Sequence, residues 1–140
     1  MRLCSHILSL ESAWITTEMS AKTVLVVDDS GFARRMLRRM LEEGGFRVEE
    51  ANGGPEAMQK YQVAKPDVVL LDIVMGEMGG FEVLEKLRQL DPKVAVVMAT
   101  ADIQTMTKDE AMVAGAAGLI NKPFKPEEVL HEVRRVTSGS

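Results

Sequence analysis

Five polar side chains stand at the ends of short apolar runs, at spacings that would bring them together in a folded chain. They are Asp28, Asp29, Asp72, Thr100 and Lys122. The runs show little alternation of apolar and polar residues, which is typical of strands buried on both faces of a parallel sheet. Parallel strands share their carboxyl ends, and in open α/β sheets ligands bind in the crevice beyond those ends. A lone aspartate there is more often a turn cap, but the coincidence of five such groups predicts a functional site.

Three carboxylates and one ammonium group in a single crevice indicate phosphate chemistry assisted by a divalent cation. Carboxylates about 4 Å apart repel by about 4 kcal/mol per pair at an effective dielectric constant of about 20, so such a site raises a pKa or takes up a cation. Hard oxygen ligands suit Mg²⁺, with Mn²⁺ as an alternative. Lys122 offers a point charge to phosphate oxygens, and Thr100 offers a hydrogen-bond donor. An ionised Asp72 is then a suitable nucleophile toward phosphorus, which would give an aspartyl phosphate.

Apolar patterning predicts the elements that must position these groups. Apolar runs predict strands at residues 23–27, 46–50, 68–72, 94–98 and 117–120. Apolar stripes at 3.6-residue spacing predict helices at residues 31–43, 55–64, 81–90 and 105–114 and from residue 126 onward. Strands that alternate with helices in this way are typical of βαβ units, whose right-handed crossovers place helices on both faces of a sheet. The predicted fold class is α/β, with a five-stranded parallel doubly wound sheet.

Local signals refine three of these elements. Ser30 is a predicted N-cap of the first helix, and Gly44 with Gly45 is predicted to end it. The strand at 46–50 is flanked by charged residues, so we expect it at an edge of the sheet. The predicted core face of the third helix consists of Phe81, Leu84, Leu87 and Leu90.

The segments VVDDSGFARRMLRRMLEEGGF, PDVVLLDIVM, MATAD and LINKPF together carry a family resemblance. The chain resembles the receiver domain of two-component response regulators, in particular the CheY-like single-domain kind, over residues 21–137. The resemblance implies a flavodoxin-like fold with strand order 2-1-3-4-5. It leaves residues 1–20 as an N-terminal extension, expected to be disordered or non-native because Met19 is a plausible native start, and residues 138–140 as a short tail.

The resemblance also implies a role for each residue of the site. Asp72 would accept the phosphoryl group, and Lys122 and Thr100 would contact it. Mg²⁺ would bind to Asp72, directly to Asp29, partly through water to Asp28, and to the backbone carbonyl of Val74. The Lys122–Pro123 peptide bond would be cis. Val74 and Asp102 flank the site, where we expect them to tune the lifetime of the phosphate.

Two departures from the family pattern concern the switch strand and the loop after Asp72. Leu119 stands at the switch position, where the family usually has an aromatic residue, so Thr100 would act on a different side chain. The loop has Met75-Gly76 and Gly79-Gly80 in place of Met-Pro and Asp-Gly. We expect the glycines to loosen the loop without removing a metal ligand.

The predicted function is that of a stand-alone response regulator. It would receive its phosphoryl group from a sensor histidine kinase or phosphotransfer protein and signal through phosphorylation-dependent binding of a protein partner, without being an enzyme in the ordinary sense. One alternative is a receiver fragment of a longer regulator. Another is a Mg²⁺-dependent phosphohydrolase, which would be expected to have Asp-x-Asp after the first strand and a cap domain. Flavin binding would require a hydroxyl-rich phosphate loop in place of the acidic Asp28-Asp29-Ser30-Gly31.

Composition narrows the class of protein. The 140 residues carry a net charge of -4, so nothing global argues for nucleic acid or an anionic membrane as a partner. The single cysteine, Cys4, cannot form an internal disulfide, and with two histidines there is no Cys/His metal cluster. No run approaches the length of a membrane span. A cytoplasmic location is expected.

Further signals have both a structural and a functional interpretation. The first predicted helix carries a basic strip made of Arg34, Arg35, Arg38 and Arg39. This strip is either a solvated face or a kinase-docking surface. A DNA contact is the third interpretation and agrees least with the acidic net charge. Met75 and Met78 beside the site either fill the core or line a partner groove. His131 is expected to be solvated.

Overall fold

Five parallel strands form one sheet in the order β2-β1-β3-β4-β5. The computed structural model of the chain describes residues 21–101 and 108–138. The strands are β1 (Thr23–Val27), β2 (Arg47–Ala51), β3 (Val68–Asp72), β4 (Val96–Thr100) and β5 (Gly118–Asn121). The predicted strand order is therefore confirmed, and β2 lies at an edge as its flanking charges indicated.

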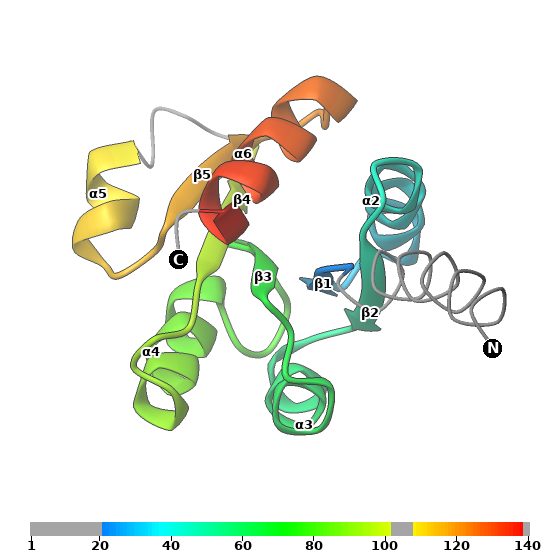
Figure 1. Ribbon diagram of the computed structural model, residues 1–140. Coiled ribbons are helices and arrows are strands. Elements are labelled where there is room, and N and C mark those ends of the chain that lie inside the picture. Colours follow the sequence, from blue (N-terminus) through cyan, green and yellow to red (C-terminus); the bar gives the residue numbers. More distant parts are fainter. Residues whose placement is uncertain (1–20, 102–107, 139–140) are drawn as a thin grey trace, which may run out of the picture.

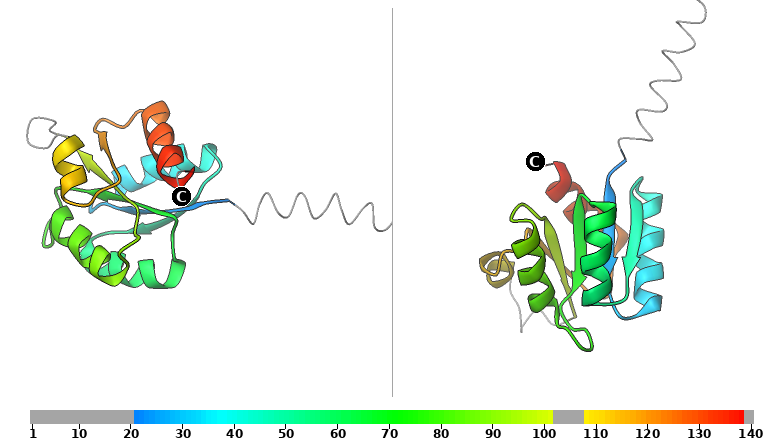
Figure 2. Two further views of the ribbon diagram at one scale, coloured as in Figure 1. Left: turned by 60° about the vertical axis from the view of Figure 1, so that its left-hand side comes forward. Right: turned by 90° about the horizontal axis from the view of Figure 1, so that it is seen from below.

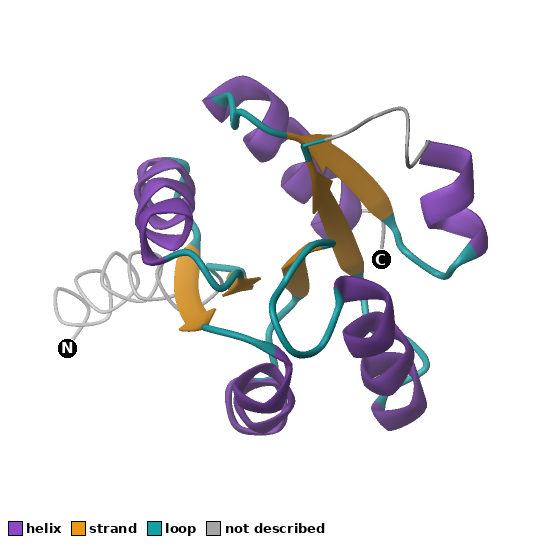
Figure 3. Cartoon of the chain, turned by 180° about the vertical axis from the view of Figure 1, so that it is seen from behind, coloured by secondary structure: helices purple, strands orange, loops and turns teal. Residues whose placement is uncertain are grey.

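Two layers of helices enclose the sheet. The helices are α2 (Gly31–Glu43), α3 (Gly54–Ala64), α4 (Gly80–Leu90), α5 (Lys108–Val113) and α6 (Pro126–Ser138). Helices α2 and α6 cover one face, while α3, α4 and α5 cover the other (Figures 1 and 2). In Figure 3 the strands, in orange, lie between the two layers. Among the described helices, none has the length and apolarity needed to cross a bilayer.

The burial of β3 shows why the apolar runs in this sequence do not alternate. Val68 and Leu70 pack toward α2 and α6, and Val69 and Leu71 pack toward α3 and α4. Successive side chains of a strand point to opposite faces, and here both faces are covered. Each fully buried Val or Leu contributes about 1.5–3 kcal/mol, so the central strand is a rigid support for the carboxylate at its end.

The ends of α2 follow the predicted capping. The Ser30 Oγ accepts a hydrogen bond from the Ala33 N–H at 3.2 Å. At the other end Gly44 is the C-cap, and Gly45 has a φ of 94°, a conformation that side chains disfavour. The helix therefore begins directly after the acidic pair that closes β1.

Several predicted boundaries were wrong by one or two residues. The strands begin at residues 47, 96 and 118 instead of 46, 94 and 117, and α3 begins at residue 54 instead of 55. The largest shift is in β4, because Val94 and Ala95 are half-buried apolar residues that precede the pairing of Val96 with Val69. Thr100 consequently ends β4 instead of following it. The predicted helix 105–114 is described only from Lys108 to Val113, and residues 105–107 lie outside the described ranges.

The predicted core face of α4 was wrong at both ends. Phe81 and Leu90 are 38% and 44% exposed, whereas Val83 is fully buried together with Leu84 and Leu87. The stripe that faces the sheet is set by Gly80, which packs against the end of β3. Positions three, four and seven residues after Gly80 share its face, and positions 81 and 90 do not.

Candidate functional site

Three carboxylates converge at the carboxyl ends of β1 and β3. One oxygen of each of Asp28, Asp29 and Asp72 lies within 4.8 Å of the others. Asp28 and Asp72 are 2% and 6% exposed, while Asp29 is exposed to solvent. The neighbouring strands β1 and β3 are in register at Val27 and Leu71, which brings the acids that follow side by side. The predicted acidic crevice is thus present, open on the Asp29 side.

Backbone N–H groups orient all three carboxylates. Each accepts one hydrogen bond from the loop that follows β1 or β3: Ser30 N–H to Asp28 at 2.9 Å, Val74 N–H to Asp72 at 3.3 Å, and Gly76 N–H to Asp29 at 3.2 Å. The last of these joins the loop after β3 to the end of β1. The loops therefore fix the carboxylates without neutralising their charge.

Lys122 reaches the two buried carboxylates from the end of β5. Its Nζ lies 3.3 Å from the Asp28 Oδ2 and 3.4 Å from the Asp72 Oδ2. The ammonium group also lies 5.7 Å from the centre of the Phe124 ring. The Lys122–Pro123 peptide bond is cis, as the family resemblance implied. One cation thus serves two buried anions, which leaves the crevice with excess negative charge.

The pKa of the Asp72 carboxyl is raised above its ordinary value. Burial is the largest cause and the charge of Asp28 the second, and both outweigh the attraction of Lys122 and the hydrogen bond from the Val74 N–H. Raised carboxylate pKa values are typical of functional sites in which like charges lie close together. A cation bound between the carboxylates would offset the charge of Asp28, lower this pKa and favour the ionised form of Asp72.

The donor set fits a hard divalent cation. Three carboxylate oxygens within 4.8 Å of one another are the ligand type and spacing that Mg²⁺ accepts, and the exposed Asp29 leaves room for the waters that Mg²⁺ retains. Among the described residues, no cysteine or histidine belongs to the cluster. A soft metal is therefore disfavoured there.

Thr100 and Val74 also lie at this edge of the sheet. Ala99 is the β4 partner of Asp72, so Thr100 stands one residue beyond it, 5% exposed, and its carbonyl accepts the Lys122 N–H at 2.8 Å. Val74 is 77% exposed at the mouth of the crevice. The roles of Thr100 as phosphate contact and of the Val74 carbonyl as metal ligand stay predictions, and Asp102 lies outside the described residues.

The loop between β3 and α4 ends in a close contact at Gly80, whereas the expectation that its glycines loosen the loop stays a prediction. A Cβ on Gly80 would collide with the backbone of Asp72 and lie 2.7 Å from the Cα of Ile73, and the Gly80 N–H donates to the Ile73 carbonyl at 2.9 Å. This glycine is required because α4 begins directly against the site strand. Met75 is 8% exposed and Met78 packs on the core, which supports the core interpretation of both methionines.

The arginine strip on α2 divides into two pairs. Arg34 and Arg38 bind the Glu50 carboxylate at 3.0 and 2.6 Å, and Arg34 also donates to the Asp28 carbonyl at 2.6 Å. Arg35 and Arg39 are exposed. No pattern in the sequence indicated the link to Glu50, because the partners lie 16 and 12 residues apart on different elements. His131 is exposed as expected.

Comparisons with known proteins agree with this geometry. The family described as "Response regulator receiver domain" matches residues 24–134. The chain is 38% identical to the chemotaxis protein CheY of Thermotoga maritima, covering 83% of this chain and 98% of that protein. It is 37% identical to CheY of Bacillus subtilis, covering 82% and 97%. The crystal structure of the Vibrio cholerae chemotaxis protein CheY4 superposes with a TM-score of 0.78 at 36% identity, covering 84% and 99%.

Proposed function

Because the chain belongs to the response regulator receiver domain family, we propose that Asp72 accepts a phosphoryl group in a Mg²⁺-dependent reaction and that the phosphorylated form binds a protein target. The donor is a phosphohistidine of a sensor histidine kinase or phosphotransfer protein. The single observation that carries the proposal is the meeting of Asp28, Asp29 and Asp72 with Lys122 at the ends of three strands.

The transfer step needs only positioning and neutralisation of charge. A carboxylate oxygen of Asp72 forms a bond to phosphorus, while the bond from phosphorus to the donor's imidazole nitrogen breaks and its electron pair returns to the ring. Asp72 is held by the Val74 N–H at 3.3 Å, so its second oxygen is available for attack. Lys122, already 3.4 Å from that second oxygen, then pairs with the phosphoryl oxygens, and the Thr100 hydroxyl supplies a further hydrogen bond.

Mg²⁺ is proposed to bind to the carboxylates of Asp28, Asp29 and Asp72 and to the backbone carbonyl of Val74. When bound, the metal neutralises charge that accumulates on the phosphoryl oxygens. The chain's own contribution is to hold the carboxylates through the N–H groups of the loops, which keeps the reacting oxygen in place.

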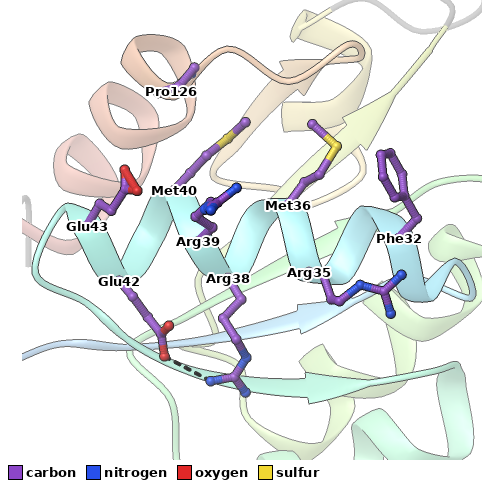
Figure 4. A pocket seen from close by; sticks show the side chains of 9 residues that line it. All are labelled: Phe32, Arg35, Met36, Arg38, Arg39, Met40, Glu42, Glu43 and Pro126. Carbon is purple, nitrogen blue, oxygen red and sulfur yellow. Dashed lines mark hydrogen bonds and ion pairs between the residues drawn. The ribbon is translucent and has the colours of Figure 1, made fainter.

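A groove along α2 and the start of α6 offers a surface for the phosphoryl donor. Phe32, Met36 and Met40 lie along one side of α2 toward Pro126, and Arg35 projects from the same helix (Figure 4). Phe32 is 66% exposed, one residue after the helix begins beside the acidic crevice. Apolar anchors bordered by arginine suit a partner helix with an apolar stripe and acidic flanks.

We consider two alternatives for the whole protein, a stand-alone regulator and the receiver domain of a longer one. The favoured version is a stand-alone regulator, since the chain covers 97–98% of two chemotaxis proteins. The alternative is the receiver of a longer regulator, since the chain matches 50% of the alkaline phosphatase synthesis transcriptional regulatory protein PhoP of Bacillus subtilis at 35% identity. In both versions the protein catalyses only its own phosphorylation and dephosphorylation.

A phosphorylation assay tests the proposal. The protein is incubated with a small acyl phosphate and Mg²⁺, and its intact mass is measured. We expect a phosphoryl adduct in the wild type and in Asp109→Asn, which removes an exposed carboxylate of α5. We expect none in Asp72→Asn or when the metal is chelated. An undiminished adduct in Asp72→Asn would refute the assignment of Asp72.

A further inference from the structure

A glutamate of α6 is buried against the outer edge of β5. Glu132 is 6% exposed, and its carboxylate accepts a hydrogen bond from the Leu119 N–H at 3.2 Å. The same carboxylate binds the Nε of Arg135 at 2.9 Å. Arg135 in turn donates from its Nη2 to the Ala117 carbonyl at 2.7 Å. Two side chains of α6, one turn apart, thus bind one backbone group of β5 and one of the residue directly before it.

These backbone groups lie where β5 has no neighbouring strand. β5 is the last strand of the sheet, and its inner side pairs with β4. An edge strand presents unpaired N–H and C=O groups, which proteins cover with charged side chains or a helix. Glu132 supplies the acceptor for the Leu119 N–H and Arg135 the donor for the Ala117 carbonyl. The pair therefore satisfies one donor and one acceptor near the start of this edge and neutralises its own charge.

Gly118 provides the space in which this pair sits. A Cβ at this position would collide with the Glu132 carboxylate and lie 2.9 Å from the Nη2 of Arg135. The residue is buried within β5, and its φ lies outside the region that only glycine favours. A side chain at position 118 would therefore have to displace the ends of Glu132 and Arg135. This contact indicates the same close fit between strand and helix as the hydrogen bonds.

The strand that α6 holds is the one that carries Lys122. Leu119 lies three residues before Lys122, whose N–H is bound to the Thr100 carbonyl at 2.8 Å and whose Nζ contacts Asp28 and Asp72. A displacement of Lys122 toward a phosphoryl group pulls on β5 at its carboxyl end. The leucine side chain at position 119 is half-buried and lacks the polar tip of a tyrosine, so the backbone link is the polar route from this strand to α6.

We infer that Glu132 and Arg135 fasten β5 to α6, so that a displacement of Lys122 on phosphorylation of Asp72 is transmitted to α6 through the Leu119 N–H and the Ala117 carbonyl. This transmission rests on the proposed function, whereas the fastening does not. Glu132 and Arg135 are positioning residues, and neither contacts the reacting atoms.

The fastening is tested in the unphosphorylated protein by amide hydrogen exchange. We expect the Leu119 amide of the wild type to exchange at the rate of the buried α6 amides, because strand and helix open together. In Glu132→Ala we expect the Leu119 amide to exchange about tenfold faster while the β3 amides are unchanged. Glu128→Ala, an exposed glutamate of the same helix, is the matched control and leaves every rate unchanged. If Glu132→Ala does not fold, Glu132→Met keeps most of the volume and removes the acceptor, and the same tenfold increase is expected.

The transmission is tested by following the backbone amide resonances of α6 before and after treatment with a small acyl phosphate and Mg²⁺. We expect residues 132–137 to shift in the wild type and in Glu128→Ala, and to shift by less than half as much in Glu132→Ala, which removes the acceptor, with the same phosphoryl adduct by mass. Equal shifts in all three proteins, or an unchanged Leu119 exchange rate in Glu132→Ala, would overturn the inference. Absence of an adduct in the wild type would instead refute the proposed function and, with it, the transmission, while the exchange rates still decide the fastening.

Discussion

Asp72 and Glu132 are two carboxylates with the same 6% exposure and opposite behaviour. Burial and the charge of Asp28 raise the pKa of the Asp72 carboxyl, and the ammonium of Lys122 only partly offsets them. Burial also acts to raise the pKa of the Glu132 carboxyl, but hydrogen bonds from Arg135 and from the Leu119 N–H outweigh it, and this pKa is lowered. Two equally exposed carboxyl groups therefore have pKa values shifted in opposite directions.

The difference between the two groups lies in their partners. Glu132 has a guanidinium to itself at 2.9 Å, whereas Asp72 shares one ammonium with Asp28 at 3.4 and 3.3 Å. A buried charge that is fully paired supports the structure, and one that is only partly paired is available for chemistry. The fold around the site at the end of β3 holds its carboxylates in place. A cation bound there would stabilise the folded state further.

The largest expected effect is that of Mg²⁺ on stability. At about 100 times its dissociation constant, a ligand that binds only the folded state stabilises it by about 2.7 kcal/mol. We expect this gain in urea unfolding of the wild type and of Glu132→Gln, and a much smaller gain in Asp72→Asn. An equal gain in Asp72→Asn would place the metal away from the carboxylates and would break the comparison.

Loss of the paired carboxylate is the next largest effect. Glu132→Ala leaves the Leu119 N–H without its acceptor and Arg135 without its anion, and we expect the free energy of unfolding to fall by about 2 kcal/mol. Glu128→Ala, on the exposed face of α6, should stay within about 0.5 kcal/mol of the wild type. The measurement is urea unfolding at neutral pH, and a neutral result for Glu132→Ala would contradict the structural role.

Loss of the partly paired carboxylate should have the opposite sign. Asp72→Asn removes the charge that burial and Asp28 disfavour, so we expect the metal-free protein to gain about 1 kcal/mol, as when a functional-site charge is neutralised. Glu85→Gln, an exposed residue of α4, is the control for neutralisation alone and should change little. Destabilisation by Asp72→Asn would show that Lys122 needs this anion more than Asp28 repels it.

The smallest expected effect is the pH dependence of these changes in the free energy of unfolding. Because the folded-state pKa of Glu132 is lowered, its stabilisation is complete above the unfolded value of 4.5 and is lost as pH falls through the lower folded value. Because the folded-state pKa of Asp72 is raised, its cost is complete above that raised value and is absent below the unfolded value of 3.8. Acidification should therefore shrink the deficit of Glu132→Ala and the gain of Asp72→Asn. Urea midpoints for the three proteins at several pH values measure both, and parallel curves would refute the assigned pKa directions.

The sequence was sufficient to predict the cluster of acids and lysine because parallel strands bring their ends together by geometry. Asp28, Asp72 and Lys122 each follow or end an apolar run, so recognising the strands was enough to predict that they meet. The resemblance to a known family added the cis bond before Pro123, which no periodicity indicates. The fold followed from the same alternation of strands and helices.

The sequence was insufficient where a residue's environment depends on a distant element. Glu132 lies among charged residues of a terminal helix, and nothing in its spacing distinguishes it from the exposed Glu128. Its carboxylate lies against Gly118, 14 positions earlier, where a side chain would meet it. The exposed ends of α4 were missed for a related reason, because the close approach of Gly80 to β3 sets which stripe faces the sheet. Contacts of this kind are visible only in three dimensions.

The covering of the β5 edge has a consequence for crowded solutions of this protein. A sheet with two accessible borders can recruit copies on both sides and grow into an open-ended ribbon. Glu132 and Arg135 occupy the Leu119 N–H and the Ala117 carbonyl, two of the groups through which a further strand would pair with β5. Addition of a second copy at this border would first have to displace both side chains, so the link between strand and helix also disfavours sheet-to-sheet polymerisation on this side.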